Sequence, residues 1–231
     1  MNAKMLLLSL APGFIQQMVL NKIVKRGYAV NTYNAKYRTT QRQLTDNEKA
    51  ALHQLFKQIP QRSKILDIGC GNGELWDKYF VANGHRVTGI DISQRQIAHA
   101  ATAVPEGHFM VGDFMTCKIG ERFDAITAFY ATYHIPANKL HKFYRKMYRL
   151  LRPGGVMLQL VRVEATKGID YWDEWCDAPM AFTYPNSAKL RNIASSEGFS
   201  TFRYKHENPE YVWLFLRKPV PSETHVPGIG R

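Results

Sequence analysis

Short apolar runs alternate with amphipathic helical patterns through the middle of the chain. Five runs are nearly continuous in apolar residues, as is typical of strands covered on both faces. They occupy residues 65–68, 86–90, 109–111, 123–129 and 156–163. Helical patterns lie between them near residues 74–82, 94–103 and 137–151. This alternation predicts an α/β fold with a doubly wound, parallel sheet and right-handed crossovers.

The C-terminal part departs from that rhythm. A helix is predicted near residues 187–197, and two alternating apolar runs follow at 199–206 and 211–216. Because their connection is very short, they predict a hairpin, so the last strand is antiparallel. The proline-rich and glycine-rich residues 218–231 predict a disordered tail.

Two helices are predicted before the sheet. The first begins at Pro12, presents one apolar stripe and is expected to end at Gly27. The second begins with a capping box formed by Thr45 and Glu48 and ends before Pro60. We therefore predict a helical arm, a main α/β domain and a tail: residues 1–60, 61–217 and 218–231.

Composition narrows the class of protein. The chain has 231 residues, of which 45% are hydrophobic, enough for one substantial core without disulfides or metals. Cys70, Cys117 and Cys176 are odd in number and form no CxxC pair, so neither a disulfide framework nor a metal site is predicted. This cysteine usage favours a reducing, cytoplasmic compartment. The apolar stretch at 5–21 is too short and too polar to span a bilayer.

The net charge of +12 is concentrated near the N-terminus. Residues 1–64 hold 11 Lys and Arg against 2 Asp and Glu. A basic arm of this kind could face nucleic acid, anionic lipid or an acidic small molecule. A solvated basic face without a partner explains the same charge, and all four interpretations stay open.

The sharpest chemical signal is a glycine-rich loop directly after the first strand. It reads Gly69-x-Gly71-x-Gly73 and leads into a helix, so it offers backbone amides to a ligand. Asp91 ends the next strand, 18 residues after Gly73. A carboxylate there can accept hydrogen bonds from two ribose hydroxyls, which predicts a nucleoside cofactor.

The loop spacing distinguishes between cofactors. Dinucleotide sites use G-x-G-x-x-G, whereas this loop has G-x-G-x-G, and Asp67 precedes it. A carboxylate at Asp67 would repel a pyrophosphate. It suits a cofactor with positive charge, such as an ammonium beside a sulfonium.

Six segments in order resemble the class I S-adenosylmethionine-dependent methyltransferases. They are Leu66–Gly73, Gly89–Ser93, Gly112–Phe114, Phe123–Ile126, Leu151–Gly155 and the C-terminal hairpin. The resemblance implies a Rossmann-like, seven-stranded sheet, mostly parallel with an antiparallel hairpin strand. It implies an enzyme that uses S-adenosylmethionine, leaves S-adenosylhomocysteine and needs no metal.

The resemblance also assigns roles at the methionine end of the cofactor. Gly69, Gly71 and Gly73 would shape the floor under it, and Asp67 would lie near its ammonium. Cys70, between two of these glycines, is interpreted as a small packed residue and not as a nucleophile.

Other residues are assigned to the adenosine end. Asp91 would hold the ribose, and Ile92 would lie against one face of the adenine. Asp113 would accept a hydrogen bond from the exocyclic amine, and Phe114 would flank the ring. Phe129, at the end of the fourth strand, is also assigned to the cofactor-binding site.

The acceptor should bind at the carboxyl ends of the strands. His134, in the segment after the fourth strand, is the candidate base, and Glu164, after the fifth, is a second candidate. An aromatic and acidic insertion at residues 164–186 could cover the acceptor. Tyr33, in the arm, could reach the methionine carboxylate as part of a lid.

The expected activity is methyl transfer to oxygen, nitrogen or carbon of a small molecule. An RNA methyltransferase is an alternative because of the basic arm, and a non-catalytic cofactor-binding subunit is another. Membrane association through a helix at residues 5–26 is a further hypothesis. The acceptor, the methylated atom and the oligomeric state do not follow from the sequence.

Overall fold

The computed structural model of the chain describes residues 10, 12–29, 43–162, 170–175, 178–183, 185–207 and 210–221. Within these ranges, seven strands form one sheet in the order β3-β2-β1-β4-β5-β9-β8. Their bounds are Lys64–Ile68 (β1), Arg86–Asp91 (β2), His108–Val111 (β3), Phe123–Phe129 (β4), Leu151–Arg162 (β5), Ser200–His206 (β8) and Tyr211–Arg217 (β9). The strands from β3 to β5 pair in parallel, and β9 is antiparallel to both β5 and β8. The predicted seven-stranded, mostly parallel sheet is confirmed.

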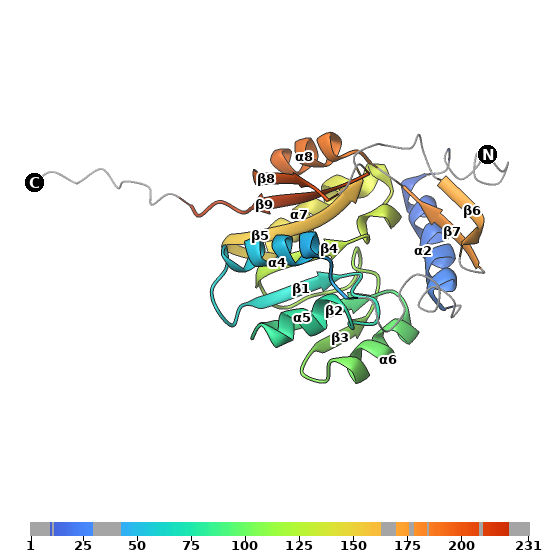
Figure 1. The fold of residues 1–231 in the computed structure, drawn as a ribbon. Helices are drawn as coiled ribbons and strands as arrows, with labels where there is room; N and C mark the ends of the chain where they lie inside the picture. The colour runs from blue at the N-terminus through green and yellow to red at the C-terminus, as the bar shows by residue number, and fades with distance from the viewer. Residues whose placement is uncertain are drawn as a thin grey trace, which may run out of the picture.

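Helices cover both faces of this sheet (Figure 1). They are α4 (Asp46–Phe56), α5 (Trp76–Ala82), α6 (Gln94–Ala103), α7 (Leu140–Leu150) and α8 (Ser187–Ser196). Neighbouring side chains of β1 point to opposite faces of the sheet, because side chains alternate along a strand. Ile65 packs in the cluster that contains α4 and α5, whereas Leu66 packs in the cluster that contains α7 and α8. Both faces are therefore buried, as the continuous apolar runs predict.

The start of β5 differs from the prediction. The sequence predicts this strand at residues 156–163, whereas β5 begins at Leu151 and includes Arg152–Gly155. Its register with β4 shifts between Phe123 and Ala125, so the segment forms an irregular start of the strand. Gly154 N–H donates to Lys218 O at 2.9 Å, and Lys218 N–H donates to Gly155 O at 2.9 Å. Because Gly154 has a φ angle of +78°, the Pro-Gly-Gly segment is a local bend in the strand, and the main-chain pairing with Lys218 holds it in place.

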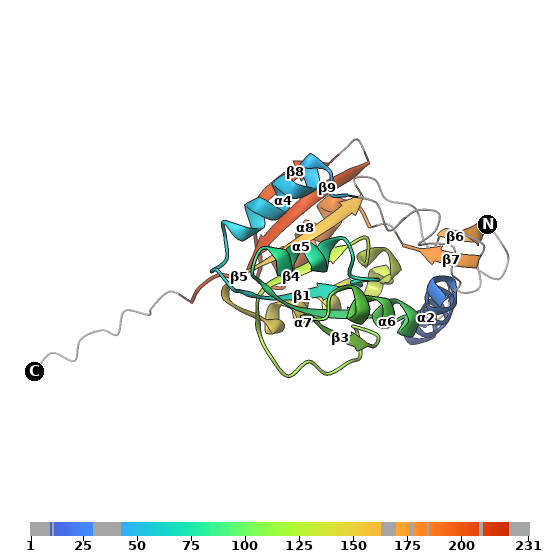
Figure 2. The same cartoon turned by 60° about the horizontal axis from the view of Figure 1, so that its bottom comes forward.

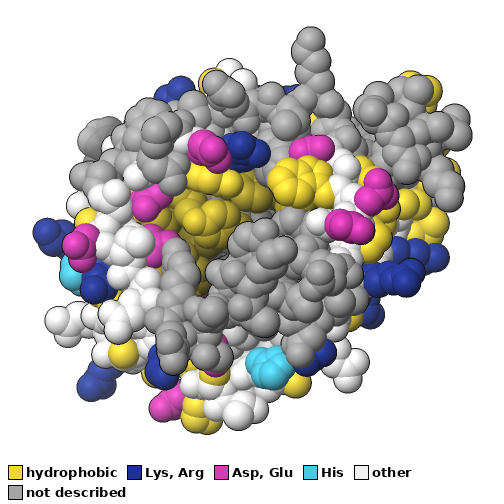
Figure 3. Space-filling model, turned by 45° about the vertical axis from the view of Figure 1, so that its right-hand side comes forward, with side chains coloured by type: hydrophobic (Ala, Val, Ile, Leu, Met, Phe, Trp, Pro, Cys, Tyr) yellow, Lys and Arg dark blue, Asp and Glu magenta, His cyan; other side chains and the backbone are white. Residues whose placement is uncertain are grey.

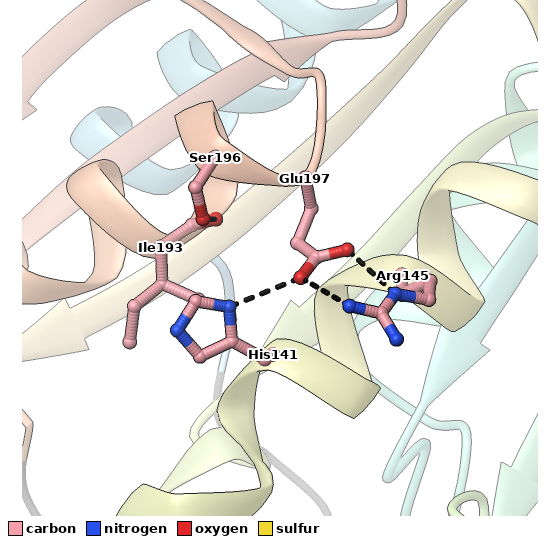
Figure 4. Close-up of polar contacts among 5 residues, drawn as sticks. All are labelled: His141, Arg145, Ile193, Ser196 and Glu197. Carbon is pink, nitrogen blue, oxygen red and sulfur yellow. Dashed lines mark hydrogen bonds and ion pairs between the residues drawn. The ribbon is translucent and has the colours of Figure 1, made fainter.

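A surface network joins α7 to the end of α8 (Figure 4). The Glu197 carboxylate accepts from Arg145 Nε at 2.8 Å and contacts His141 Nδ1 at 3.0 Å. The hydrogen bond from Arg145 is the main reason that the pKa of Glu197 lies below its usual value. Because His141 and Arg145 are exposed, this network adds little to stability.

The N-terminal helix α2 (Gly13–Ala29) packs beside a hairpin in the predicted insertion. Strands β6 (Asp170–Trp175) and β7 (Ala178–Phe182) form this two-stranded sheet, which the sequence analysis did not predict. Figures 1 and 2 show α2 and the hairpin together at one end of the main sheet. No helix in the described part of the chain is long and apolar enough to cross a bilayer.

The prediction that Gly27 ends the first helix is wrong, since α2 continues to Ala29. A Cβ atom at Gly27 would lie 2.4 Å from Met180 Cε and 3.1 Å from Pro179 O. The glycine is thus explained by close packing against β7. We expect Gly27→Leu to separate α2 from the hairpin, because overpacking costs about 1–3 kcal/mol.

This change should raise the rate of proteolysis within α2 roughly tenfold. Lys25→Leu, on the exposed side of the same helix, is the control and should leave the rate unchanged. Equal cleavage rates in both variants would disprove this explanation of Gly27.

Candidate functional site

A cavity with an empty volume of about 870 Å³, part of it open to solvent, lies among the segments that follow β1, β2, β3 and β4. Figure 3 shows the side of the molecule on which α2 and the hairpin lie, where hydrophobic side chains line a hollow. Ligands of open α/β sheets bind at this edge, so the cavity is the candidate site.

The glycine loop forms one wall of the cavity. Gly69 and Gly71 line it with φ angles of +70° and +60°, which favour glycine. A Cβ atom at Gly69 would lie 2.7 Å from Ala131 Cβ, so a side chain there would clash with the segment after β4. Gly73 is not among the lining residues, because its α-carbon packs towards α6, where an added Cβ would lie 3.2 Å from Ala100 Cβ. The third glycine is therefore explained by helix packing.

Main-chain amides fix the Asp91 carboxylate at the cavity. Gly71 N–H donates to Asp91 Oδ2 at 3.0 Å, and Ser93 N–H donates to Asp91 Oδ1 at 2.8 Å. Asp91 and the following Ile92 both line the cavity. The predicted ribose-binding carboxylate thus lies beside the glycine loop.

Asp113 and Phe114 line the cavity beyond Asp91. Asp113 Oδ1 accepts from Met115 N–H at 2.8 Å, and Asp113 Oδ2 accepts from Asn21 Nδ2 at 2.8 Å. The Phe114 ring is buried and packs edge-on against Phe143, with 5.7 Å between the ring centroids. The two residues assigned to the adenine are therefore neighbours in space with defined orientations.

Asp67 and Cys70 lie beneath this surface. Both are 2% exposed and neither is among the lining residues. Asp67 Oδ1 accepts a hydrogen bond of 2.6 Å from Thr127 Oγ1 on β4. Burial raises the pKa of the Cys70 thiol, and nearby carboxylates raise it further. A neutral, buried thiol agrees with the interpretation of Cys70 as a packed residue, whereas the role of Asp67 stays a prediction.

His134 lines the cavity from the short 3₁₀ helix η1 (Thr132–His134). Its Nδ1 lies 3.0 Å from Ala181 O, and its Nε2 lies 3.2 Å from the Tyr28 hydroxyl. A carbonyl only accepts, so the neutral ring carries its proton on Nδ1, and Nε2 accepts from Tyr28. Burial lowers the pKa of His134 to about 4. The imidazole is therefore neutral at pH 7, with a basic nitrogen at Nε2.

Two predicted site residues cannot be placed. Tyr33 and Glu164 lie outside the described residues, so both assignments stay predictions. Phe129 lines the cavity as expected, and its ring centroid lies 4.4 Å from that of Trp76.

The sequence predicted that tyrosines of the arm, Tyr28 among them, lie over the cofactor, but it did not indicate that the helix α2 itself lines the site. Asn21, Val24 and Tyr28 line the cavity opposite the strands, and Tyr130 lines it with a φ angle of +60°. The apolar stripe of α2 indicated that one face is covered. It did not indicate which part of the fold that face meets, because that depends on tertiary packing.

The residues present fit S-adenosylmethionine. Among the described residues that line the cavity, the acidic side chains are those of Asp91 and Asp113, and none is Lys or Arg. Two carboxylates suit ribose hydroxyls and an adenine amine, and they disfavour a pyrophosphate.

Comparison with known proteins agrees with this assignment. Residues 65–155 match the family model described as a methyltransferase domain. The chain is 35% identical over 100 residues to dTDP-4-amino-2,3,4,6-tetradeoxy-D-glucose N,N-dimethyltransferase of Saccharopolyspora spinosa, covering 42% of this chain and 40% of that protein. It is 30% identical over 106 residues to malonyl-[acyl-carrier protein] O-methyltransferase of Enterobacter lignolyticus, covering 45% and 41%. The chain thus matches less than half the length of these relatives.

Solved structures share the fold over most of the chain. The DhpI–SAH complex has a TM-score of 0.69 at 19% identity, covering 87% of this chain and 98% of that one. The CcbJ methyltransferase from Streptomyces caelestis has a TM-score of 0.66 at 13% identity, covering 85% and 99%. Residues 65–155 thus match a methyltransferase domain, and the chain shares the fold of these solved structures.

Proposed function

We propose that the chain transfers the methyl group of S-adenosylmethionine to oxygen, nitrogen or carbon of a small-molecule acceptor. The proposal depends on one observation: Asp91, Asp113 and the neutral imidazole of His134 line the same cavity. The relatives support a small acceptor, since their names refer to a sugar nucleotide and to a malonyl group on a carrier protein.

The cofactor's sulfonium would supply an electrophilic methyl group. In the proposal, Gly69 and Gly71 let the backbone approach the methionine part. Asp91 accepts hydrogen bonds from the ribose hydroxyls, and Asp113 accepts one from the adenine amine. Asp67, below the loop, adds a negative charge that favours the cofactor's ammonium.

The residues at the other end of the cavity would position the acceptor and exclude water. Tyr28 and Tyr130 line the cavity together with His134. The imidazole centroid lies 5.7 Å from that of the Tyr28 ring and 5.3 Å from that of Phe182, which packs behind it. Placing an acceptor atom about 3–3.5 Å from the methyl carbon supplies much of the rate enhancement. The described lining holds no Lys or Arg.

His134 would remove the acceptor's proton. Its Nδ1–H is directed to Ala181 O, so Nε2 is the nitrogen that takes a proton. The Tyr28 hydroxyl lies 3.2 Å from Nε2. A hydroxyl or amine of the acceptor would approach Nε2 in the same way. A positioned base contributes about 10²–10⁴-fold to such a reaction.

The pKa of His134 gives a testable pH dependence. A base must be neutral to accept a proton, and this ring becomes protonated only as the pH falls through about 4. We expect kcat/KM to show no inflection near the ordinary histidine value of about 6.5 and to fall only at the lower pH. A pH–rate profile measured where tryptophan fluorescence shows the protein folded checks this. An inflection of kcat/KM between pH 6 and 7 that is absent from His134→Gln would contradict it.

The proposal is tested with methyl-labelled S-adenosylmethionine and a cell extract separated into metabolite, lipid, RNA and protein fractions. We expect label in the metabolite fraction. Label in RNA would favour the alternative suggested by the basic arm. Cofactor binding without label in any fraction would favour a non-catalytic subunit. The cytoplasmic location stays a prediction from cysteine usage.

A further inference from the structure

The loop after β3 carries residues of the site, although it is neither helix nor strand. Residues 112–117 follow an edge strand and contribute Asp113, Phe114 and Met115 to the cavity. Inside the loop, Thr116 N–H and Cys117 N–H both donate to Asp113 O, at 3.0 and 2.9 Å. This single turn is local, so it does not tie the loop to the rest of the domain.

The loop is tied to the domain by Gly112 N–H, which donates to Asp91 O, by the hydrogen bond from Asn21 to Asp113, and by the packing of Phe114 on Phe143. Lys146 adds the charged connection. Lys146 Nζ donates to Phe114 O at 2.5 Å and to Cys117 O at 2.6 Å. The same ammonium lies 4.6 Å from the centroid of the Phe114 ring. Lys146 belongs to α7, whose position is fixed by fully buried side chains such as Phe143 and Met147. A single charged group thus joins both ends of the turn, and the ring beside it, to the core.

We propose that Lys146 is a positioning residue for the adenine end of the cofactor. By holding the carbonyls of Phe114 and Cys117, it keeps the Asp113 carboxylate and the Phe114 ring directed into the cavity. Hydrogen bonds from a charged donor are stronger than neutral ones, and their loss leaves two carbonyls without this donor. The inference rests on the proposed function, because it assumes that Asp113 and Phe114 bind adenine.

The test replaces Lys146 with methionine in the full chain and measures the Kd for S-adenosylhomocysteine by calorimetry. We expect the Kd to rise at least tenfold, while kcat at saturating cofactor stays within about twofold, because Lys146 is not among the cavity-lining residues. Lys142→Met, on the exposed side of the same helix, is the matched control and should not change the Kd. Lys146→Arg keeps a charged donor and should recover part of the affinity.

A second readout needs no cofactor. Hydrogen–deuterium exchange of residues 112–117 should become faster in Lys146→Met and remain at the wild-type rate in Lys142→Met. A variant whose Kd stays within twofold of wild type overturns the inference, whether or not the loop exchanges faster. If the wild-type chain itself gives no binding heat, the proposed function fails, and the exchange rates still show whether Lys146 holds the loop.

Discussion

Replacing Asp91 with alanine should raise the Kd for S-adenosylhomocysteine by about 100-fold or more. The carboxylate is the proposed acceptor for two ribose hydroxyls, and hydrogen bonds to a charged group contribute about 1.5–3 kcal/mol each. It also accepts from Gly71 N–H and Ser93 N–H, so its loss releases the glycine loop as well. Calorimetric titration of the variant measures the change.

Two further variants make this result specific. Asp91→Asn keeps one acceptor oxygen and the size of the side chain, so its Kd should lie between those of wild type and Asp91→Ala. Glu106→Ala removes an exposed carboxylate elsewhere on the domain and should have no effect. A Kd for Asp91→Ala within tenfold of wild type would remove Asp91 from the proposed ribose site.

Replacing His134 with alanine should lower turnover by about 10²-fold or more and leave the cofactor Kd within about threefold. The split is expected because His134 is the proposed base, whereas the proposed cofactor contacts come from Asp91 and Asp113. Single-turnover rates with methyl-labelled cofactor measure the chemical step, and calorimetry measures binding.

His141→Ala is the matched control for this variant, since His141 is an exposed histidine bonded to Glu197. It should leave turnover unchanged. His134→Gln retains a polar side chain next to Ala181 and guards against a loss of turnover caused by local collapse. An unaltered rate in His134→Ala would assign the residue to packing.

The sheet could be predicted because its signals are local. Strands buried on both faces are nearly continuous in apolar residues, and the alternating runs at 200–206 and 211–217 form the expected hairpin. The capping box at Thr45 and Glu48 is present in the structure, with both hydrogen bonds formed. Each of these features depends on residues close together in the chain.

Other features depend on contacts between distant segments. Gly27 has a low helix propensity, yet it lies inside α2. A larger residue there would clash with Met180 and Pro179, which pack against the helix. Tyr28 lines the cavity only because this packing places α2 above the strand ends. No pattern within α2 specifies that neighbour, which is why the sequence indicated a covered face but not its partner.

The same reasoning applies within the site. Asp91 could be predicted because it ends a strand of a parallel sheet, whose carboxyl ends meet at one edge. Asp113 was assigned through the resemblance to the methyltransferase family. Lys146 gave no comparable signal, because a lysine on an amphipathic helix usually faces solvent. Its role follows only from the hydrogen bonds to Phe114 and Cys117.

Calorimetric titration of the full chain with S-adenosylhomocysteine tests the central claim most directly. The account predicts saturable binding of one equivalent, together with no binding of NADH. Saturable binding of NADH without any heat from S-adenosylhomocysteine would contradict it.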